Sequence, residues 1–250
     1  MPRKKIVFVI VEGPSDDEAI GLLLSKIFDD AQVFVHITWG DVTTQKDSTP
    51  ANILVKIGNM INSYASSNHF SKKLFREVIH IVDTDGAYIP DNAVNYDCSA
   101  EHPRYSLTTI QTVNPKAIIQ RNNIKNQCLD KMASAKTVCG ISYHVYYMSC
   151  NLDHVLYDLM NPSDEEKESN SIRFARKYEN NTQDFIQYIS NSEFSVKGSY
   201  PQTWEYIRKE LHSLERHTNL GICFETQKSE GSSYTIYALI VLVSPTAPDF

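Results

Sequence analysis

The sequence predicts an α/β fold in which a parallel sheet is flanked by helices, and two observations carry this prediction. Residues 6–10 and 78–82 form short apolar runs with abrupt polar ends, which is typical of strands buried on both faces of a parallel sheet. The segments between such runs carry apolar residues every three or four positions, as amphipathic helices do. Because strands and helices alternate, we expect right-handed crossovers within one sheet.

Recognisable start signals separate the expected elements. Ser15 and Glu18 have the spacing of a capping box, which predicts a helix directly after the first strand. Residues 33–38 are rich in β-branched and aromatic side chains and favour a second strand. Thr49-Pro50 is expected to open the next helix with proline at its first position, and the third strand then ends at Asp83.

The pattern is less regular after the third strand. Residues 86–113 are predicted to form a long irregular loop, and such a loop beside a site is more often functional than idle. Asn114-Pro115 predicts a helix that reaches about residue 135, and residues 141–148 predict a fourth strand followed by a short helix. We therefore expect a catalytic domain over residues 1–155.

Residues 156–250 are predicted to form a mainly helical accessory region. Its first part is polar and helical in pattern, and further helices are expected at Thr182 and Pro201. The apolar stretch at residues 234–243 favours a buried strand, with a short core helix as the alternative. This region could dimerise, which would make the chain a homo-oligomer, or it could dock a partner or grip substrate.

Composition and charge restrict the class of protein. The chain has 250 residues, of which 42% are hydrophobic and 22% charged, as in an ordinary globular protein, and no apolar run is long enough for a membrane span. The basic N-terminus precedes an apolar run that is too short for a signal peptide and ends in Glu-Gly. Five scattered cysteines without C-x-x-C spacing favour a reducing cytoplasm. The net charge of −6 counts mildly against a general nucleic-acid binder but does not exclude a nuclease.

Three carboxylates are expected to meet at one edge of the sheet. Glu12 follows the first strand, and Asp83 and Asp85 follow the third, where an extended backbone would send both aspartates to one side. Converging carboxylates repel one another unless a cation lies between them. Hard oxygen ligands favour Mg²⁺, with Mn²⁺ as a close substitute. The sequence thus predicts a metal site formed by catalytic carboxylates.

The two motifs that carry these residues, Val-Glu-Gly-Pro-Ser-Asp at 11–16 and Asp-Thr-Asp-Gly at 83–86, resemble the TOPRIM pattern. The first is most similar to the OLD-like and RloB-like branch of nucleases, which is associated with phage defence. The resemblance covers about the first 90 residues well and extends loosely to residue 155. It implies a Mg²⁺-dependent nuclease of DNA or RNA in which Asp16 is a further metal ligand. It also implies that Asn151 and Asp153 line the site.

A nuclease of this kind needs cations for the substrate as well as carboxylates for the metal. Two metal ions can assist an in-line displacement at phosphorus, while basic side chains hold the phosphates. We expect Lys116, Arg121 and Lys125 to bind phosphate, with Arg216-His217 as a second choice. The chain lacks a G-x-x-x-x-G-K-[ST] motif, so resemblance to the OLD-like branch implies a separately encoded ATPase partner.

Two other functions remain open at this point. An Asp-x-Asp-Gly motif after a strand also occurs in haloacid-dehalogenase-like phosphatases, although there it usually follows the first strand. Those enzymes need a later acidic residue at a strand tip, and neither Asp130 nor Asp164-Glu165 is predicted to occupy one. A non-catalytic TOPRIM scaffold is the third hypothesis. The presence of all four acidic residues, Glu12, Asp16, Asp83 and Asp85, counts against it, because neutral residues would repel less in the absence of metal.

Overall fold

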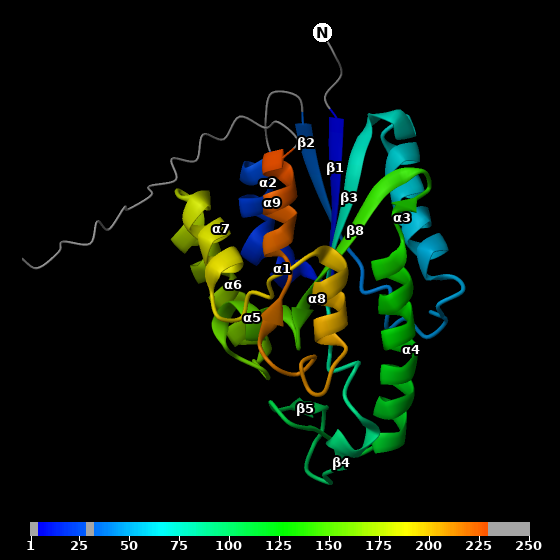
Figure 1. Ribbon diagram of the computed structural model, residues 1–250, viewed down its shortest axis with the longest axis vertical. Coiled ribbons are helices and arrows are strands. Elements are labelled where there is room, and N and C mark those ends of the chain that lie inside the picture. Colours follow the sequence, from blue (N-terminus) through cyan, green and yellow to red (C-terminus); the bar gives the residue numbers. More distant parts are fainter. Residues whose placement is uncertain (1–4, 29–32, 230–250) are drawn as a thin grey trace, which may run out of the picture.

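The computed structural model describes residues 5–28 and 33–229, and within them a six-stranded sheet lies between two layers of helices (Figure 1). The order is β2-β1-β3-β8-β7, and β9 also pairs with β8. β2, β1, β3 and β8 run parallel to one another, whereas β7 and β9 run antiparallel to β8. The α/β prediction is confirmed, with a sheet that is mixed rather than wholly parallel. The strands are β1 (Lys5–Val11), β2 (Val33–Trp39), β3 (Phe75–Asp83), β7 (Thr137–Val138), β8 (Ile141–Ser149) and β9 (His217–Thr218).

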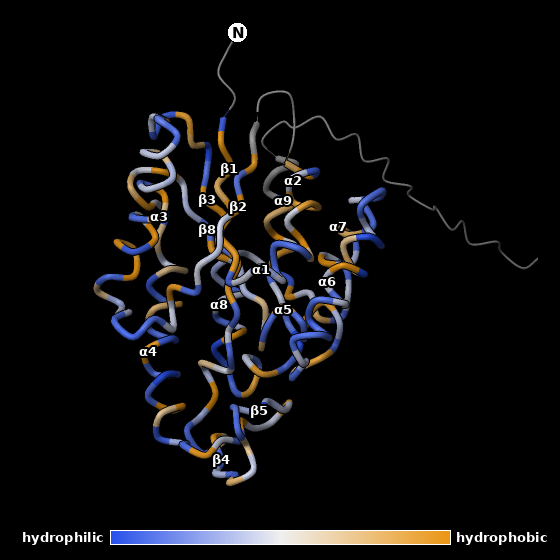
Figure 2. The backbone as a smooth tube through the Cα atoms, turned by 180° about the vertical axis from the view of Figure 1, so that it is seen from behind, coloured by the Kyte–Doolittle hydropathy of each residue, from blue (hydrophilic) through white to orange (hydrophobic). Residues whose placement is uncertain are grey.

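Alternating side chains of the strands build a hydrophobic core on each face of the sheet. Val7 and Val9 of β1 enter one core, and Phe8 and Ile10 enter the other. Figure 2 shows bands of polar and apolar residues along the helices that cover these faces, as the amphipathic pattern predicts. The core with Phe8 is closed by α3 (Ile53–Ser67), α4 (Pro115–Ser134) and α8 (Tyr200–Ile207). The core with Val7 is closed by η1 (Asp17–Gly21), α2 (Leu22–Phe28), α5 (Leu152–Tyr157), α6 (Asp164–Tyr178), α7 (Thr182–Asn191) and α9 (Gly221–Ser229).

Two predicted helix starts are wrong, each for a local reason. The first helix, α1 (Pro14–Asp16), begins at Pro14, and the Asp16 carboxylate accepts the backbone N–H groups of Glu12 and Gly13. Asp16 therefore takes the capping role that the sequence suggested for Glu18. α1 continues into η1, a π-helical turn. α3 begins at Ile53 rather than Pro50, because Thr49 to Asn52 form a turn first.

Residues 86–113 are largely irregular, as predicted, but three short strands within them form a small sheet that the sequence did not predict. After the turn η3 (Asp91–Ala93), β6 (Ile110–Thr112) pairs with both β4 (Val94–Tyr96) and β5 (Arg104–Tyr105). Ile110 is fully buried in a third apolar cluster with residues of α4 and the segment after α8. Asn161 also accepts the N–H of Tyr105 and donates to its carbonyl, both at 2.8 Å. The small sheet is therefore fixed against the main body.

The region after residue 155 is mainly helical in its described part, as predicted, with α6, α7, α8 and α9. It contributes to both main cores, for example through Phe185 on one face and Trp204 on the other. The division at residue 155 stays a prediction. The apolar stretch at 234–243 lies outside the described residues. None of the helices within residues 5–28 and 33–229 is both long and apolar enough to cross a membrane.

Candidate carboxylate site at the sheet edge

Neighbouring parallel strands deliver polar side chains to one edge of the sheet. Glu12 directly follows β1, Asp83 ends β3, and Asn151 follows β8 after one intervening residue. The order β2-β1-β3-β8 places β1 and β3 at the point where the chain switches direction across the sheet, which is where α/β folds bind ligands. A pocket of about 760 Å³ opens there, and its polar lining includes Glu12, Asp16, Asp41, Asp83, Asp85, Asn151 and Asp153.

Backbone amides orient the two carboxylates at the switch point. The N–H of Asp83 donates to Glu12 Oε1 at 2.9 Å, which joins the ends of β1 and β3. The N–H of Leu152, in the first turn of α5, donates to Asp83 Oδ1 at 2.9 Å. Such charge-assisted bonds are about twice as strong as neutral ones, so both carboxylates are held in place before any ligand arrives.

Asp85 reaches the pocket by a different backbone path from the one predicted. Its φ is +48°, so the chain turns after Asp83 instead of continuing as an extended strand. The Asp85 N–H donates to the carbonyl of Cys150 at 2.7 Å, and Oδ2 lies 2.5 Å from Lys125 Nζ. Gly86 follows at φ +67°, with Leu214 packed where a Cβ would lie. The Asp-Thr-Asp-Gly motif is thus a tight turn that directs Asp85 toward α4.

Lys125 lies beneath the carboxylates with no exposed side-chain surface. Its Nζ is 2.5 Å from Asp85 Oδ2 and 3.8 Å from Glu12 Oε1. Burial lowers the pKa of Lys125, but Asp85, Glu12 and Asp41 raise it more, and the net pKa lies above the usual value. The ammonium therefore stays protonated and offsets part of the negative charge. A lysine buried in this way has no exposed surface with which to bind phosphate, which is the role that the sequence suggested.

The carboxylates carry more negative charge than the nearby lysine offsets. Burial raises the pKa of Glu12 well above its usual value, although Lys125 opposes the shift. Burial also raises the pKa of Asp83, and repulsion from Glu12, Asp16 and Asp85 adds to it. For Asp16, burial raises the pKa to about 6. These shifts mark a cluster that a further cation would stabilise.

Asn151 and Asp153, which follow β8, line the same pocket. Asn151 caps α5, because its side-chain oxygen accepts the N–H of His154 at 2.8 Å, and its amide donates to Met160 at 3.2 Å. Asp153 is buried, and burial raises its pKa against the opposing charge of Lys167. Asn151 therefore has a structural role of its own, while the Asp153 carboxylate adds charge to the pocket.

The other predicted cations do not reach free phosphate-binding positions. Lys116 is exposed on α4 and does not line the pocket. Arg121 donates to the Asp85 carbonyl and to the Tyr105 hydroxyl, both at 2.8 Å, so it fixes the turn rather than facing solvent. Arg216 donates to the carbonyl of Val155, away from the pocket. Lys167 of α6 and Arg104 of the small sheet line the pocket instead, and sequence reasoning missed both.

Asp41 is the acidic residue that the sequence reasoning overlooked. It follows β2 after Gly40 and lines the pocket beside Glu12. Burial raises its pKa, but Lys125 and hydrogen bonds from Thr44 and Thr43 outweigh that and leave the pKa below its usual value. The available signal is positional: an acidic residue lies three positions after the predicted strand at 33–38, near a strand end as Glu12 and Asp83 are.

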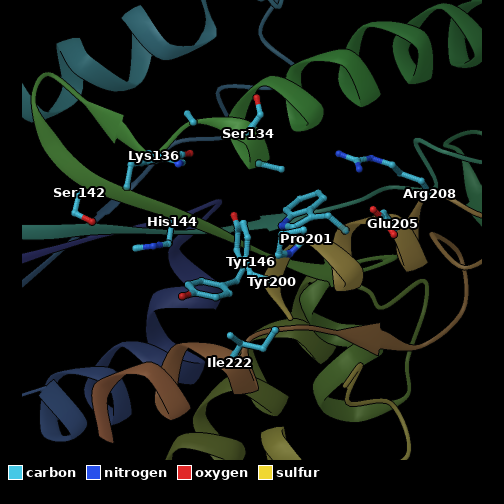
Figure 3. Close-up of a pocket in the computed structure, with 14 residues that line it drawn as sticks. Ser134, Lys136, Ser142, His144, Tyr146, Tyr200, Pro201, Glu205, Arg208 and Ile222 are labelled. Carbon is cyan, nitrogen blue, oxygen red and sulfur yellow. The ribbon is translucent and has the colours of Figure 1, made fainter. Parts of the chain in front are cut away.

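A second cavity of about 620 Å³ has a different character (Figure 3). It lies between β8, the end of α4 and α8, with Tyr146, Tyr200 and His144 on its wall. The Tyr200 hydroxyl bonds to the N–H and carbonyl of Val145, which covers the edge of β8. Arg208 at the rim donates to Asp130 at 2.8 Å. None of the predicted site residues lines this cavity, so it does not compete with the sheet edge as the carboxylate site.

The residues of the sheet edge fit a hard divalent cation in their chemistry. Their donors are carboxylate oxygens, and burial together with repulsion from neighbouring carboxylates raises the pKa of Glu12 and of Asp83. Within residues 5–28 and 33–229, no three His, Cys, Asp or Glu side chains already form a metal-binding group. The carboxylates are instead held by backbone amides and by Lys125. A cation would therefore bind among charged side chains that do not already form a complete set of metal ligands.

Comparisons with protein-family models, with curated proteins and with solved structures find no match for this chain.

Proposed function

We propose that this chain is a Mg²⁺-dependent nuclease that hydrolyses phosphodiester bonds of nucleic acid, with Mn²⁺ as a substitute metal. The observation that carries the proposal is the convergence of Glu12, Asp83 and Asp85 at the β1–β3 switch point. The resemblance of both motifs to the TOPRIM pattern supports it. By the same resemblance, we propose a cytoplasmic phage-defence effector that acts with a separately encoded ATPase.

The chain's own residues divide the work in this proposal. Glu12, Asp83 and Asp85 would hold the metal, with Asp16 and Asp41 close enough to share its charge. The bound metal would supply Lewis-acid stabilisation of the charge that develops on the phosphate oxygens. Lys125 pairs with Asp85 and Glu12 and opposes the rise in the pKa of Glu12.

The wall of the pocket would position the substrate. The small sheet contributes Arg104 and Tyr105, and α6 contributes Lys167. Arg104 and Lys167 are the lining cations that could contact a phosphate, because Lys125 has no exposed surface. A phosphodiester would then lie between the carboxylates and this wall.

The test incubates the purified chain with plasmid DNA, single-stranded DNA and total RNA in Mg²⁺, Mn²⁺ or EDTA. We expect metal-dependent cleavage, at least about 100-fold slower in Glu12→Gln and Asp83→Asn. Glu168→Gln is the matched control, since Glu168 is exposed on α6 and does not line the pocket. Circular dichroism would show that the variants remain folded.

Each alternative function predicts a different pattern. Hydrolysis of small phosphate esters with no action on nucleic acid would favour the dehalogenase-like phosphatase. If the chain, alone or with a co-purified ATPase, hydrolyses neither nucleic acid nor small phosphate esters in the presence of metal, that result would favour the non-catalytic scaffold.

A further inference from the structure

The turn that carries Asp85 has a backbone conformation that residues other than glycine rarely adopt. Asp85 lies at φ +48° and Gly86 at φ +67°, so two consecutive residues are left-handed. Such a conformation persists only where the surrounding structure fixes it. The turn determines where the Asp85 carboxylate lies, so the groups that hold the turn also determine the geometry of the carboxylate site.

One of the residues that hold the turn is Ser213, in the segment between α8 and β9. Its carbonyl accepts the Thr84 hydroxyl at 2.8 Å and the N–H of Gly86 at 3.2 Å. Its own hydroxyl accepts the N–H of Tyr88 at 3.2 Å. Thr84 and Ser213 have no exposed surface, and neither lines the carboxylate pocket. The middle residue of the Asp-Thr-Asp motif is therefore bonded to the C-terminal helical region.

The segment that carries Ser213 is itself fixed to the main sheet. The His212 carbonyl accepts the hydroxyl of Ser149, the last residue of β8, at 2.7 Å. β9 then pairs with the same end of β8. Leu214 is fully buried and packs where a Cβ of Gly86 would lie. Ser213 is thus a firm support for the turn, because its neighbours on both sides are anchored.

We propose that Thr84 and Ser213 form a positioning pair that holds the Asp85 carboxylate in place to bind a divalent cation. This inference rests on the proposed function for the identity of the ligand. Neither residue would touch the cation, because both act through the turn. Removal of a hydrogen bond that orients a metal ligand typically weakens metal binding about 10- to 100-fold. The pair also gives the accessory region predicted over residues 156–250 a definite role, since Ser213 of that region completes the carboxylate site.

Metal affinity is the direct test, and it does not depend on cleavage. Thr84→Val keeps the shape of the side chain but removes the donor. We expect it to bind Mn²⁺ about 10-fold more weakly, as measured by the EPR signal of the free ion. Thr84→Ser keeps the hydroxyl and should restore most of the affinity. Ser213→Ala removes the acceptor for the Tyr88 N–H, so it should weaken binding in the same direction, and it tests the pair if Thr84→Val does not fold.

Thr203→Val is the matched control. Thr203 is also fully buried, and its hydroxyl donates to the carbonyl of Tyr200 at 2.8 Å within α8. The same hydroxyl accepts the side-chain amide of Asn219 at 3.0 Å, so its loss should destabilise the fold at least as much as loss of the Thr84 hydroxyl. Because these bonds lie within α8 and to Asn219 rather than to the turn, the Mn²⁺ affinity should stay at the wild-type value.

Unfolding by urea in EDTA gives a second readout, which needs no metal. If Thr84 holds Asp85 against Lys125, then Lys125→Met should shift the urea midpoint less in the Thr84→Val background than in the wild type. The shifts from Thr203→Val and Lys125→Met should add. A role for Thr84 in stability alone predicts additive shifts for both pairs.

The outcomes separate this inference from the proposed function. Wild-type Mn²⁺ affinity in both Thr84→Val and Ser213→Ala, or additive shifts for Thr84→Val with Lys125→Met, would overturn the positioning pair even if the chain cleaves nucleic acid. Weaker Mn²⁺ binding in Thr84→Val that Thr84→Ser restores, in a chain with no metal-dependent cleavage, would support the pair and count against the nuclease. A wild-type chain that binds no Mn²⁺ would overturn both.

Discussion

Replacement of Lys125 by methionine tests the charge balance of the site. Methionine has a similar length and removes the ammonium, whose Nζ lies 2.5 Å from Asp85 and 3.8 Å from Glu12. Removing one partner of a buried ion pair costs about 3–5 kcal/mol, because the other charge is left without compensation. That is a large fraction of a typical stability of about 5–15 kcal/mol. For a chain of this size, we expect a fall in Tm of about 10 °C.

The assay is thermal and urea unfolding of Lys125→Met beside Lys131→Met, which makes the same change at an exposed position of the same helix. Lys131→Met should be nearly neutral. Mg²⁺ should stabilise Lys125→Met more than the wild type, because the cation then compensates charge that the lysine no longer offsets. If Lys125→Met unfolds at the same urea concentration as Lys131→Met, or gains nothing from Mg²⁺, the proposed charge balance is refuted.

Two further predictions concern the supports of the site. His80 is buried, with a ring nitrogen 2.9 Å from the Tyr143 hydroxyl, and burial lowers its pKa to about 3, so the unfolded chain binds a proton more readily than the folded chain. The free energy of unfolding should therefore fall below about pH 6.5, by up to ~1.4 kcal/mol per pH unit. His80→Asn should flatten the dependence of the urea midpoint on pH between pH 7 and 5. Gly86→Ala places a methyl group 2.8 Å from Leu214 at φ +67°, whereas the methyl group of Gly140→Ala meets nothing within 4 Å at φ +79°. In urea unfolding, Gly86→Ala should lose about 1–3 kcal/mol more of the free energy of unfolding than Gly140→Ala. Equal losses would rule out the packing argument.

Strand-and-helix periodicity sufficed to predict the elements that position the site. β1, β3 and β8 carry apolar runs with abrupt polar ends, and those ends are where Glu12, Asp83 and Asn151 lie. These features are local, because a buried parallel strand is apolar along its length and its last residue meets solvent. The small sheet within residues 86–113 gave no comparable signal. Its strands have two or three residues each, too few for a period to appear.

The surroundings of Lys125 and Asp41 depend on contacts between distant segments, which the sequence alone does not show. Lys125 resembles its exposed neighbours on α4 in the sequence, and only the packing of α4 beneath the turn at Asp85 makes it a buried counter-ion. Asp41 becomes a pocket residue because β2 is the neighbour of β1, a pairing that no local pattern fixes. Acidic residues at strand ends are therefore predictable one strand at a time. The charge balance among them follows from which strands are neighbours and which helix lies beneath.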